Sequence, residues 1–245
     1  MTDKNPLLGL RDEIDALDLQ IMQSISDRAR CAQRVAEIKK EQGDAAYYKP
    51  EREAQVLRHI MESNAGPLDN EEMARLFRQI MSACLALEQP VKVAFLGPEG
   101  TFTQEAALKH FGDSAVSVPM AAIDEVFREV LAGACNYGVV PVENSTEGVI
   151  SHTLDSFMDS SLKICGEVEL RIHQNFLIGP NTNKDNITRV YSHAQSLAQC
   201  RQWLNSNFPN IERVAVNSNA EAAKRVQGEW NSAAIAGDMS CKLYY

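Results

Sequence analysis

Hydrophobic positions in the first third of the chain repeat at three- and four-residue steps, which is the periodicity of an α-helix. The first repeat predicts a helix from Pro6 to Gln42, with Asn5 as its N-cap and Gly43 just after its end. At 1.5 Å per residue such a helix is about 55 Å long, which is too long for a small compact domain. We therefore expect a partner, most simply a second copy of the chain, to cover its apolar face.

Two shorter helices are predicted after the long one. The first begins at Pro50 and stops at the Asn64–Pro67 breaker segment. The second begins at Asp69, which can form a capping box with Glu72, and Pro90 ends it.

The pattern changes after Pro90 to short β-branched runs that alternate with amphipathic runs. This alternation is typical of an α/β domain with a mostly parallel sheet, so we expect a helical domain over 1–90 and an α/β domain over 91–245. The predicted strands cover 91–96, 115–118, 137–142, 162–178, 189–192, 213–216 and 233–236. The predicted helices cover 103–111, 123–131, 150–158, 197–208 and 221–226.

Composition narrows the possible partners. The net charge of -9 is unfavourable for binding nucleic acid or an anionic membrane. The sequence has neither an apolar run long enough to span a bilayer nor the pattern of a signal peptide at its start. Its six cysteines form no C-x-x-C pair, so we expect no zinc site, and reduced thiols fit a cytoplasmic protein.

Two cations interrupt the apolar stripe of the long helix. Arg28 and Lys39 point within about 20° of each other and lie about 16 Å apart along the axis, so together they could bracket a small anion. Arg11 points about 100° away, so it cannot easily serve the same pocket within one helix, but it could serve a pocket in a dimer partner. Cations that extend to solvent from an apolar face are an alternative interpretation. Several such residues together favour a ligand, because burying unpaired charge is unfavourable.

These residues resemble the all-helical chorismate mutase family over residues 5–89. The resemblance rests on Asn5-Pro6-Leu7-Leu8, on Arg11, Arg28 and Lys39, and on Pro50-Glu51-Arg52-Glu53. It implies an all-α fold of three helices and an intertwined dimer in which each site takes Arg11 from the other chain.

The resemblance also implies a role for each residue. Arg11, Arg28 and Arg52 would hold the carboxylates of chorismate, Lys39 would face its ether oxygen, and Glu53 would accept a hydrogen bond from its hydroxyl group. The reaction is a single pericyclic step, which needs no cofactor, metal or nucleophile.

Two positions depart from the best-known members of the family. Cys84 stands where a serine is frequent, and Glu88 stands where a glutamine faces the lysine. A glutamate can donate a hydrogen bond to the ether oxygen only when it is protonated, so we expect mutase activity to depend on the protonation of Glu88.

Four polar loops at predicted strand ends resemble the prephenate dehydratase family from Val91 to about Leu243. They are Gly-Pro-Glu-Gly-Thr at 97–101, Pro-Val-Glu-Asn-Ser at 141–145, Ser-His-Ala-Gln-Ser at 192–196 and the segment 217–223. Each loop alone could be a helix cap. Together they imply two α/β lobes around a cleft, as in periplasmic binding proteins, in which prephenate is converted to phenylpyruvate during phenylalanine biosynthesis. The residues expected to line that cleft are Thr101, Asn144, Ser145, Ser192, His193 and Gln195.

The whole chain thus resembles bifunctional chorismate mutase–prephenate dehydratases. That family continues past the position of Tyr245 with a Thr-Arg-Phe segment and a regulatory ACT domain, so we expect a C-terminally truncated, impaired dehydratase. The expected ligands are chorismate and prephenate, and the expected partner is a second copy that pairs through the N-terminal helices. A small-molecule sensor carried on a helical dimerisation module is the alternative.

Overall fold

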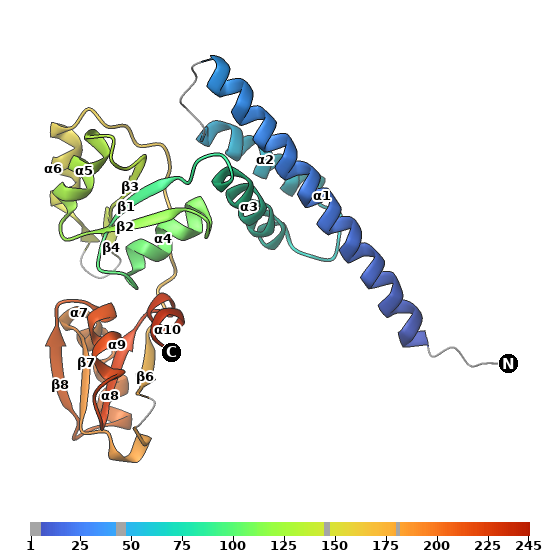
Figure 1. Cartoon of the computed structure of the whole chain (residues 1–245). Coiled ribbons are helices and arrows are strands. Elements are labelled where there is room, and N and C mark those ends of the chain that lie inside the picture. The colour runs from blue at the N-terminus through green and yellow to red at the C-terminus, as the bar shows by residue number, and fades with distance from the viewer. Residues whose placement is uncertain (1–5, 43–47, 145–147, 180–181) are drawn as a thin grey trace. The chain divides into compact units, whose positions relative to one another are not determined.

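The computed structural model describes residues 6–42, 48–144, 148–179 and 182–245, and the chain in it divides into two compact units (Figure 1). The helical unit comprises 1–91 together with the short segment 111–115. The α/β unit comprises 92–110 and 116–245.

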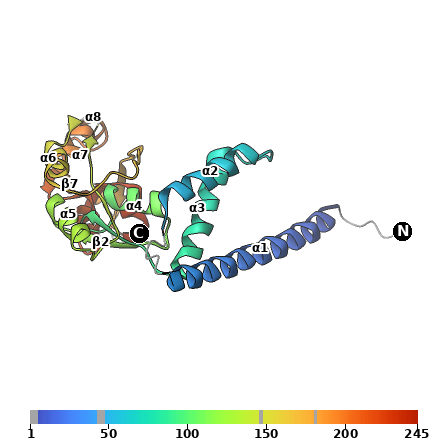
Figure 2. The same ribbon diagram turned by 90° about the horizontal axis from the view of Figure 1, so that it is seen from above.

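The helical unit contains α1 (Pro6–Gln42), α2 (Pro50–Ser63) and α3 (Asn70–Ala86). The bounds of α1 are those predicted from the sequence, and it runs as one unbroken rod past α2 and α3 (Figure 2). Asp69 caps α3 by accepting a hydrogen bond from the Glu72 N–H at 2.7 Å, which is one half of the predicted capping box. The carboxylate of Glu72 accepts hydrogen bonds from Arg75. Within the described ranges, no helix is both long and apolar enough to cross a membrane.

The apolar stripe of α1 is largely exposed in a single chain. Ile14, Leu17 and Ile21 are each at least 50% exposed. The side chains of Leu57, Ala74 and Cys84, on the other two helices, are buried. An apolar surface of this extent on one helix indicates an interaction surface.

The first lobe of the α/β unit is built around β1 (Lys92–Leu96), which lies between β2 (Val116–Met120) and β3 (Tyr137–Val139). Both neighbours are parallel to β1. Val93, Ala94 and Phe95 are completely buried, as expected of a central parallel strand covered on both faces. The other elements of this lobe are α4 (Phe102–Phe111), α5 (Ile123–Leu131), the antiparallel pair β4 (Glu143–Asn144) and β5 (Gly148–Val149), and α6 (Ser151–Asp159).

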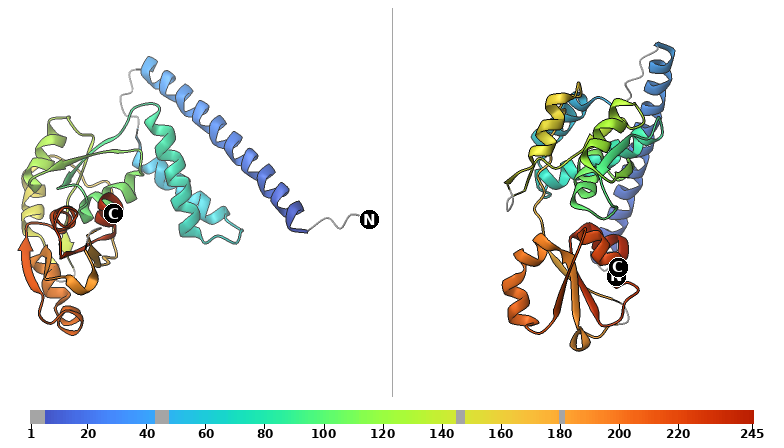
Figure 3. Two further views of the ribbon diagram at one scale, coloured as in Figure 1. Left: turned by 60° about the horizontal axis from the view of Figure 1, so that its bottom comes forward. Right: turned by 90° about the vertical axis from the view of Figure 1, so that its left-hand side faces the viewer.

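The second lobe contains a four-stranded sheet in the order β6-β9-β7-β8, seen in the right-hand view of Figure 3. Its strands are β6 (Asn175–Ile178), β7 (Arg189–His193), β8 (Glu212–Val216) and β9 (Ser232–Ala236). Only β6 is antiparallel to its neighbour, so the predicted mostly parallel sheet is confirmed. The helical elements are the 3-10 turn η1 (Lys184–Asn186), α7 (Ala194–Gln199), α8 (Arg201–Asn207), α9 (Asn219–Val226) and α10 (Asp238–Tyr244).

Three predicted elements of the α/β unit need correction. The predicted strand 162–178 is wrong over 162–174, where no strand forms and Ile164 is 71% exposed, because a strand needs a neighbour that takes its backbone hydrogen bonds. The predicted helix 197–208 is interrupted at Cys200 and forms α7 and α8. The strand predicted to reach residue 142 ends at Val139, since Pro141 has no N–H to donate to a sheet. The helix α10 is not among the predicted elements.

Candidate active sites

Lys39 and Glu88 interact electrostatically in the helical unit although they are far apart in sequence. Lys39 lies in the last turn of α1, and Glu88 follows the end of α3. Burial raises the pKa of the Glu88 carboxyl group, and the nearby Lys39 ammonium group lowers it, with burial the larger effect. Arg28 is half-buried on α1, about three turns before Lys39.

Glu53 of α2 lies at a second polar contact between helices. Its side chain is 16% exposed, and its Oε1 is 3.6 Å from Nε of Arg78 on α3. Burial raises the pKa of Glu53, whereas a hydrogen bond from Tyr48 and the Arg78 charge lower it. Arg52, the residue before Glu53, is exposed.

Arg78 was not predicted as a site residue. The available signal was its place in an i, i+4 row between Ala74 and Ser82, which are both buried small residues. A long cation between two such positions is directed into the packed part of the unit. The large apolar residues of the helix give a stronger periodic signal than this row of small residues.

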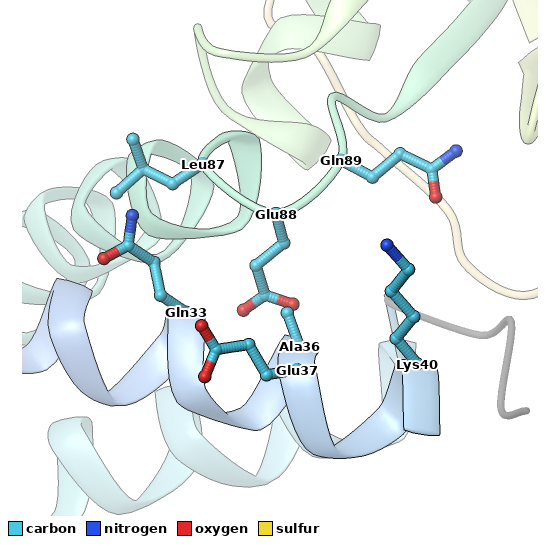
Figure 4. A pocket seen from close by; sticks show the side chains of 7 residues that line it. All are labelled: Gln33, Ala36, Glu37, Lys40, Leu87, Glu88 and Gln89. Atoms are coloured by element: carbon cyan, nitrogen blue, oxygen red, sulfur yellow. The ribbon is translucent and has the colours of Figure 1, made fainter. Parts of the chain in front are cut away.

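A hollow of about 500 Å³ lies beside these residues, between α1 and the end of α3 (Figure 4). In this view the Glu88 side chain extends toward Ala36 and Glu37 of α1. The residues that line the hollow are Gln33, Ala36, Glu37, Lys40, Leu87, Glu88 and Gln89. Glu88 is the one predicted mutase residue among them, and Cys84 is buried one turn earlier on α3. The hollow therefore borders the predicted mutase site.

Arg11 does not join the other predicted mutase residues within one chain. It is exposed on the N-terminal part of α1, about 25 Å along the helix from Arg28 and about 42 Å from Lys39. No arginine side chain spans either distance.

In the α/β unit, Thr101 lies in the turn between β1 and α4. Its Oγ1 donates a hydrogen bond to the Leu96 carbonyl oxygen at 3.1 Å. The preceding Gly100 has a φ of 86°, and its N–H donates to Oε1 of Gln104 at 2.7 Å. Ser240 of α10 donates to the Gly100 carbonyl oxygen at 2.8 Å. The turn is therefore hydrogen-bonded to residues of both lobes.

A side-chain hydrogen bond joins the polar loops of the two lobes. Nε2 of Gln195, on α7, donates to Oδ1 of Asn144, on β4, at 3.2 Å. The structure thus brings together two of the residues predicted to line the dehydratase cleft. Ser145, a third, lies outside the described residues.

Asn219, at the start of α9, organises the end of β7. Its Oδ1 accepts a hydrogen bond from the His193 N–H at 3.0 Å and lies 2.8 Å from Oγ of Ser192. Ser192 is fully buried, and its Oγ is also 2.7 Å from the Ile235 carbonyl oxygen. Asn219 was not predicted individually, although it belongs to a polar loop that the sequence analysis singled out. Its signal was a polar side chain at the start of an alanine-rich helix.

Fold and site together define the class of this protein. Acidic and basic side chains gather on a three-helix unit, and polar loops meet between two α/β lobes. This combination fits the class of enzyme that the resemblance implied, with a helical mutase domain and a two-lobed dehydratase domain.

Comparison with known proteins gives the same result. The chorismate mutase type II family model matches residues 10–89, and the prephenate dehydratase family model matches residues 93–245. The bifunctional chorismate mutase/prephenate dehydratase of Pseudomonas aeruginosa is 68% identical over 248 residues, which cover 100% of this chain and 68% of that protein. The corresponding protein of Stutzerimonas stutzeri is 67% identical with the same coverage.

A solved structure is similar to the α/β unit. The prephenate dehydratase from Arthrobacter aurescens in complex with L-Phe is 29% identical, with a TM-score of 0.52. The match covers 62% of this chain and 52% of that one.

This chain belongs to the bifunctional chorismate mutase/prephenate dehydratase family. Its helical domain is a chorismate mutase, and its α/β domain is a prephenate dehydratase domain. The predicted function in phenylalanine biosynthesis is confirmed, and the alternative of a sensor on a dimerisation module is not favoured.

Proposed function

We propose that chorismate is rearranged to prephenate at a site shared by two copies of this chain. One chain supplies Arg28, Lys39, Arg52, Glu53, Cys84 and Glu88, and its partner supplies Arg11. The observation that carries this proposal is that the Lys39 charge acts on the partly buried carboxyl group of Glu88, beside a hollow between α1 and the end of α3.

The reaction requires only that the substrate is held in a reactive conformation and that its developing charge is stabilised. Chorismate is a dicarboxylate, and its rearrangement needs the folded conformer to be held while negative charge grows on the breaking ether oxygen. Arginine binds carboxylates through two parallel hydrogen bonds, which suits Arg28, Arg52 and the partner's Arg11.

The remaining residues act on the ether and hydroxyl groups. Lys39 and protonated Glu88 donate hydrogen bonds to the ether oxygen. Glu53 accepts a hydrogen bond from the ring hydroxyl group. Cys84, which is buried on the same helix that leads to Glu88, closes the wall of the site.

The exposed stripe of α1 supports the homodimer. Leu10, Ile14, Leu17 and Ile21 repeat along one helix and are each at least 50% exposed. A second copy laid along this helix would bury them, and it would carry its own Arg11 into reach of the first chain's site.

We further propose that prephenate binds between the two lobes of the α/β domain. Thr101, Asn144, Ser145, His193 and Gln195 would contact it. The polar side chains of Asn144 and Gln195 already meet there. Ser192 is buried and would hold His193 in place together with Asn219.

Two broader features complete the proposal. The domains extend over 1–90 and 91–245, supported by family matches at 10–89 and 93–245. We place the enzyme in the cytoplasm, which is supported by six free cysteines, because thiols persist in a reducing compartment.

The test of the mutase site is Lys39→Ala in the full chain. Loss of the charge facing the ether oxygen should lower kcat about a hundredfold, since a donor aimed at developing negative charge contributes roughly 3 kcal/mol. The fall in chorismate absorbance measures the rate. Lys40→Ala is the control, because Lys40 is an exposed cation that lines the neighbouring hollow but is not part of the proposed site, and it should stay within about twofold of the wild type. Near wild-type turnover in Lys39→Ala would refute the site.

A further inference from the structure

We propose that Arg78 is a positioning residue for the mutase reaction, which holds Glu53 in place as an ionised acceptor for the substrate hydroxyl group. This inference rests on the proposed role of Glu53. It assigns to Arg78 a function that neither the sequence motifs nor the family match provides.

The geometry places Arg78 next to the Glu53 carboxylate. Its Nε lies 3.6 Å from Oε1 of Glu53, and the two side chains are 27% and 16% exposed. That Nε is buried and has no hydrogen-bond partner within the described residues. A separation of 3.6 Å is an ion-pair distance that is long for a direct hydrogen bond. Contacts of this kind commonly shorten when substrate binds.

Glu53 needs such a neighbour because it is partly buried. Burial raises its pKa and therefore favours the protonated form, which would no longer act only as an acceptor. Two groups oppose this effect, the hydroxyl group of Tyr48 from the segment before α2 and the guanidinium group of Arg78 from α3. Of these two groups, Arg78 is the one that carries a positive charge.

The packing of α3 explains why the cation is held there. Arg78 lies one turn from Ala74 and one turn from Ser82, and both are 8% exposed. Two small neighbours leave room for a long side chain to lie against α2. Arg75 shows the contrast, because it is 59% exposed and pairs with Glu72 on its own helix.

The experiment measures kcat/KM of the mutase against pH in the full chain. In Arg78→Met, which keeps the unbranched stem, the pKa of Glu53 should rise. The acid limb of the profile should then move to higher pH by about one unit or more, because an opposite charge within a few ångströms typically shifts a carboxyl pKa by 1–3 units. On the acid side of the limb kcat/KM should fall about tenfold. Arg78→Lys, which keeps the positive charge, should leave the limb close to its wild-type position, and Arg75→Met should leave the profile unchanged.

Each outcome decides between distinct possibilities. If the acid limb of kcat/KM lies at the same pH in Arg78→Met as in Arg75→Met, the proposed positioning role is wrong. Should Arg78→Met fail to fold, Arg78→Gln provides the same neutral test. Glu53→Gln separates this inference from the proposed function on which it rests. If the Glu53→Gln enzyme has wild-type kcat/KM, Glu53 has no role in the mutase site. If Glu53 matters, adding Arg78→Met to Glu53→Gln should produce no further movement of the limb.

Discussion

In the proposed mutase site, the protonation of Glu88 controls the rate of the chemical step. Burial holds its pKa above the usual range of a glutamate, and Lys39 opposes that shift. Only the protonated form can donate a hydrogen bond to the ether oxygen. The rate of the chemical step should therefore fall as pH rises through the pKa of Glu88. In Glu88→Gln, whose amide cannot ionise, the alkaline side of the kcat profile should become flat.

A neighbouring acid provides the control for this prediction. Glu37 lines the same hollow as Glu88 but is not part of the proposed site. Glu37→Gln should keep the alkaline fall, because it changes the local charge without removing the donor. A Glu88→Gln profile with the same alkaline fall as the wild type would show that Glu88 is not the titrating donor.

Some residues of the proposed sites have a signal in the sequence and others have none. Arg28 and Lys39 stand out because each is a charge on a stripe that is otherwise apolar. The role of Arg78 depends on Glu53, and that of Asn219 on Ser192 and His193, so both roles exist only after distant segments pack together. Periodicity within one helix contains no information about such partners.

The same distinction holds for secondary structure elements. The bounds of α1 were predicted because both of its ends have local signals, and the same is true of the cap that Asp69 provides for α3. The strand predicted over 162–174 does not form, because a strand depends on a neighbouring strand that local sequence cannot reveal.

The turn between β1 and α4 depends on Gly100. Its φ of 86° is unfavourable for other residues, and an added Cβ would lie 3.2 Å from the Ala220 Cβ and from Oγ of Ser240. Gly100→Ala should lower the free energy of unfolding of the α/β unit by about 1–2 kcal/mol for the backbone alone, and by more because of these contacts. Urea unfolding followed by tryptophan fluorescence reports on this unit alone, since the chain's 2 tryptophans are Trp203 and Trp230.

Gly133 is the matched control for Gly100. Its φ is 73°, and an added Cβ would meet nothing within 4 Å. Gly133→Ala should therefore show only the backbone effect. Equal losses in the two variants would show that the contacts with α9 and α10 do not constrain the turn.

At the scale of the whole molecule, the main feature of the helical unit is a long helix that a single chain leaves largely exposed. The apolar stripe of α1 is exposed, and Arg11 lies about 42 Å along the helix from Lys39. One arrangement resolves both features, in which two copies lie along each other and exchange their Arg11 side chains. In the proposed arrangement, catalysis requires the dimer, because each site takes Arg11 from the other chain.

Mixing two inactive variants tests this central claim most directly. Arg11→Ala and Arg28→Ala should each be nearly inactive alone, because each removes a carboxylate-binding arginine from every site. In a mixed dimer one site keeps both arginines and the other keeps neither. Random pairing of equal amounts should therefore restore about a quarter of the wild-type mutase activity. If a fluorescence energy-transfer signal shows that the chains exchange and the activity of the mixture stays at the level of the separate variants, the shared site is contradicted.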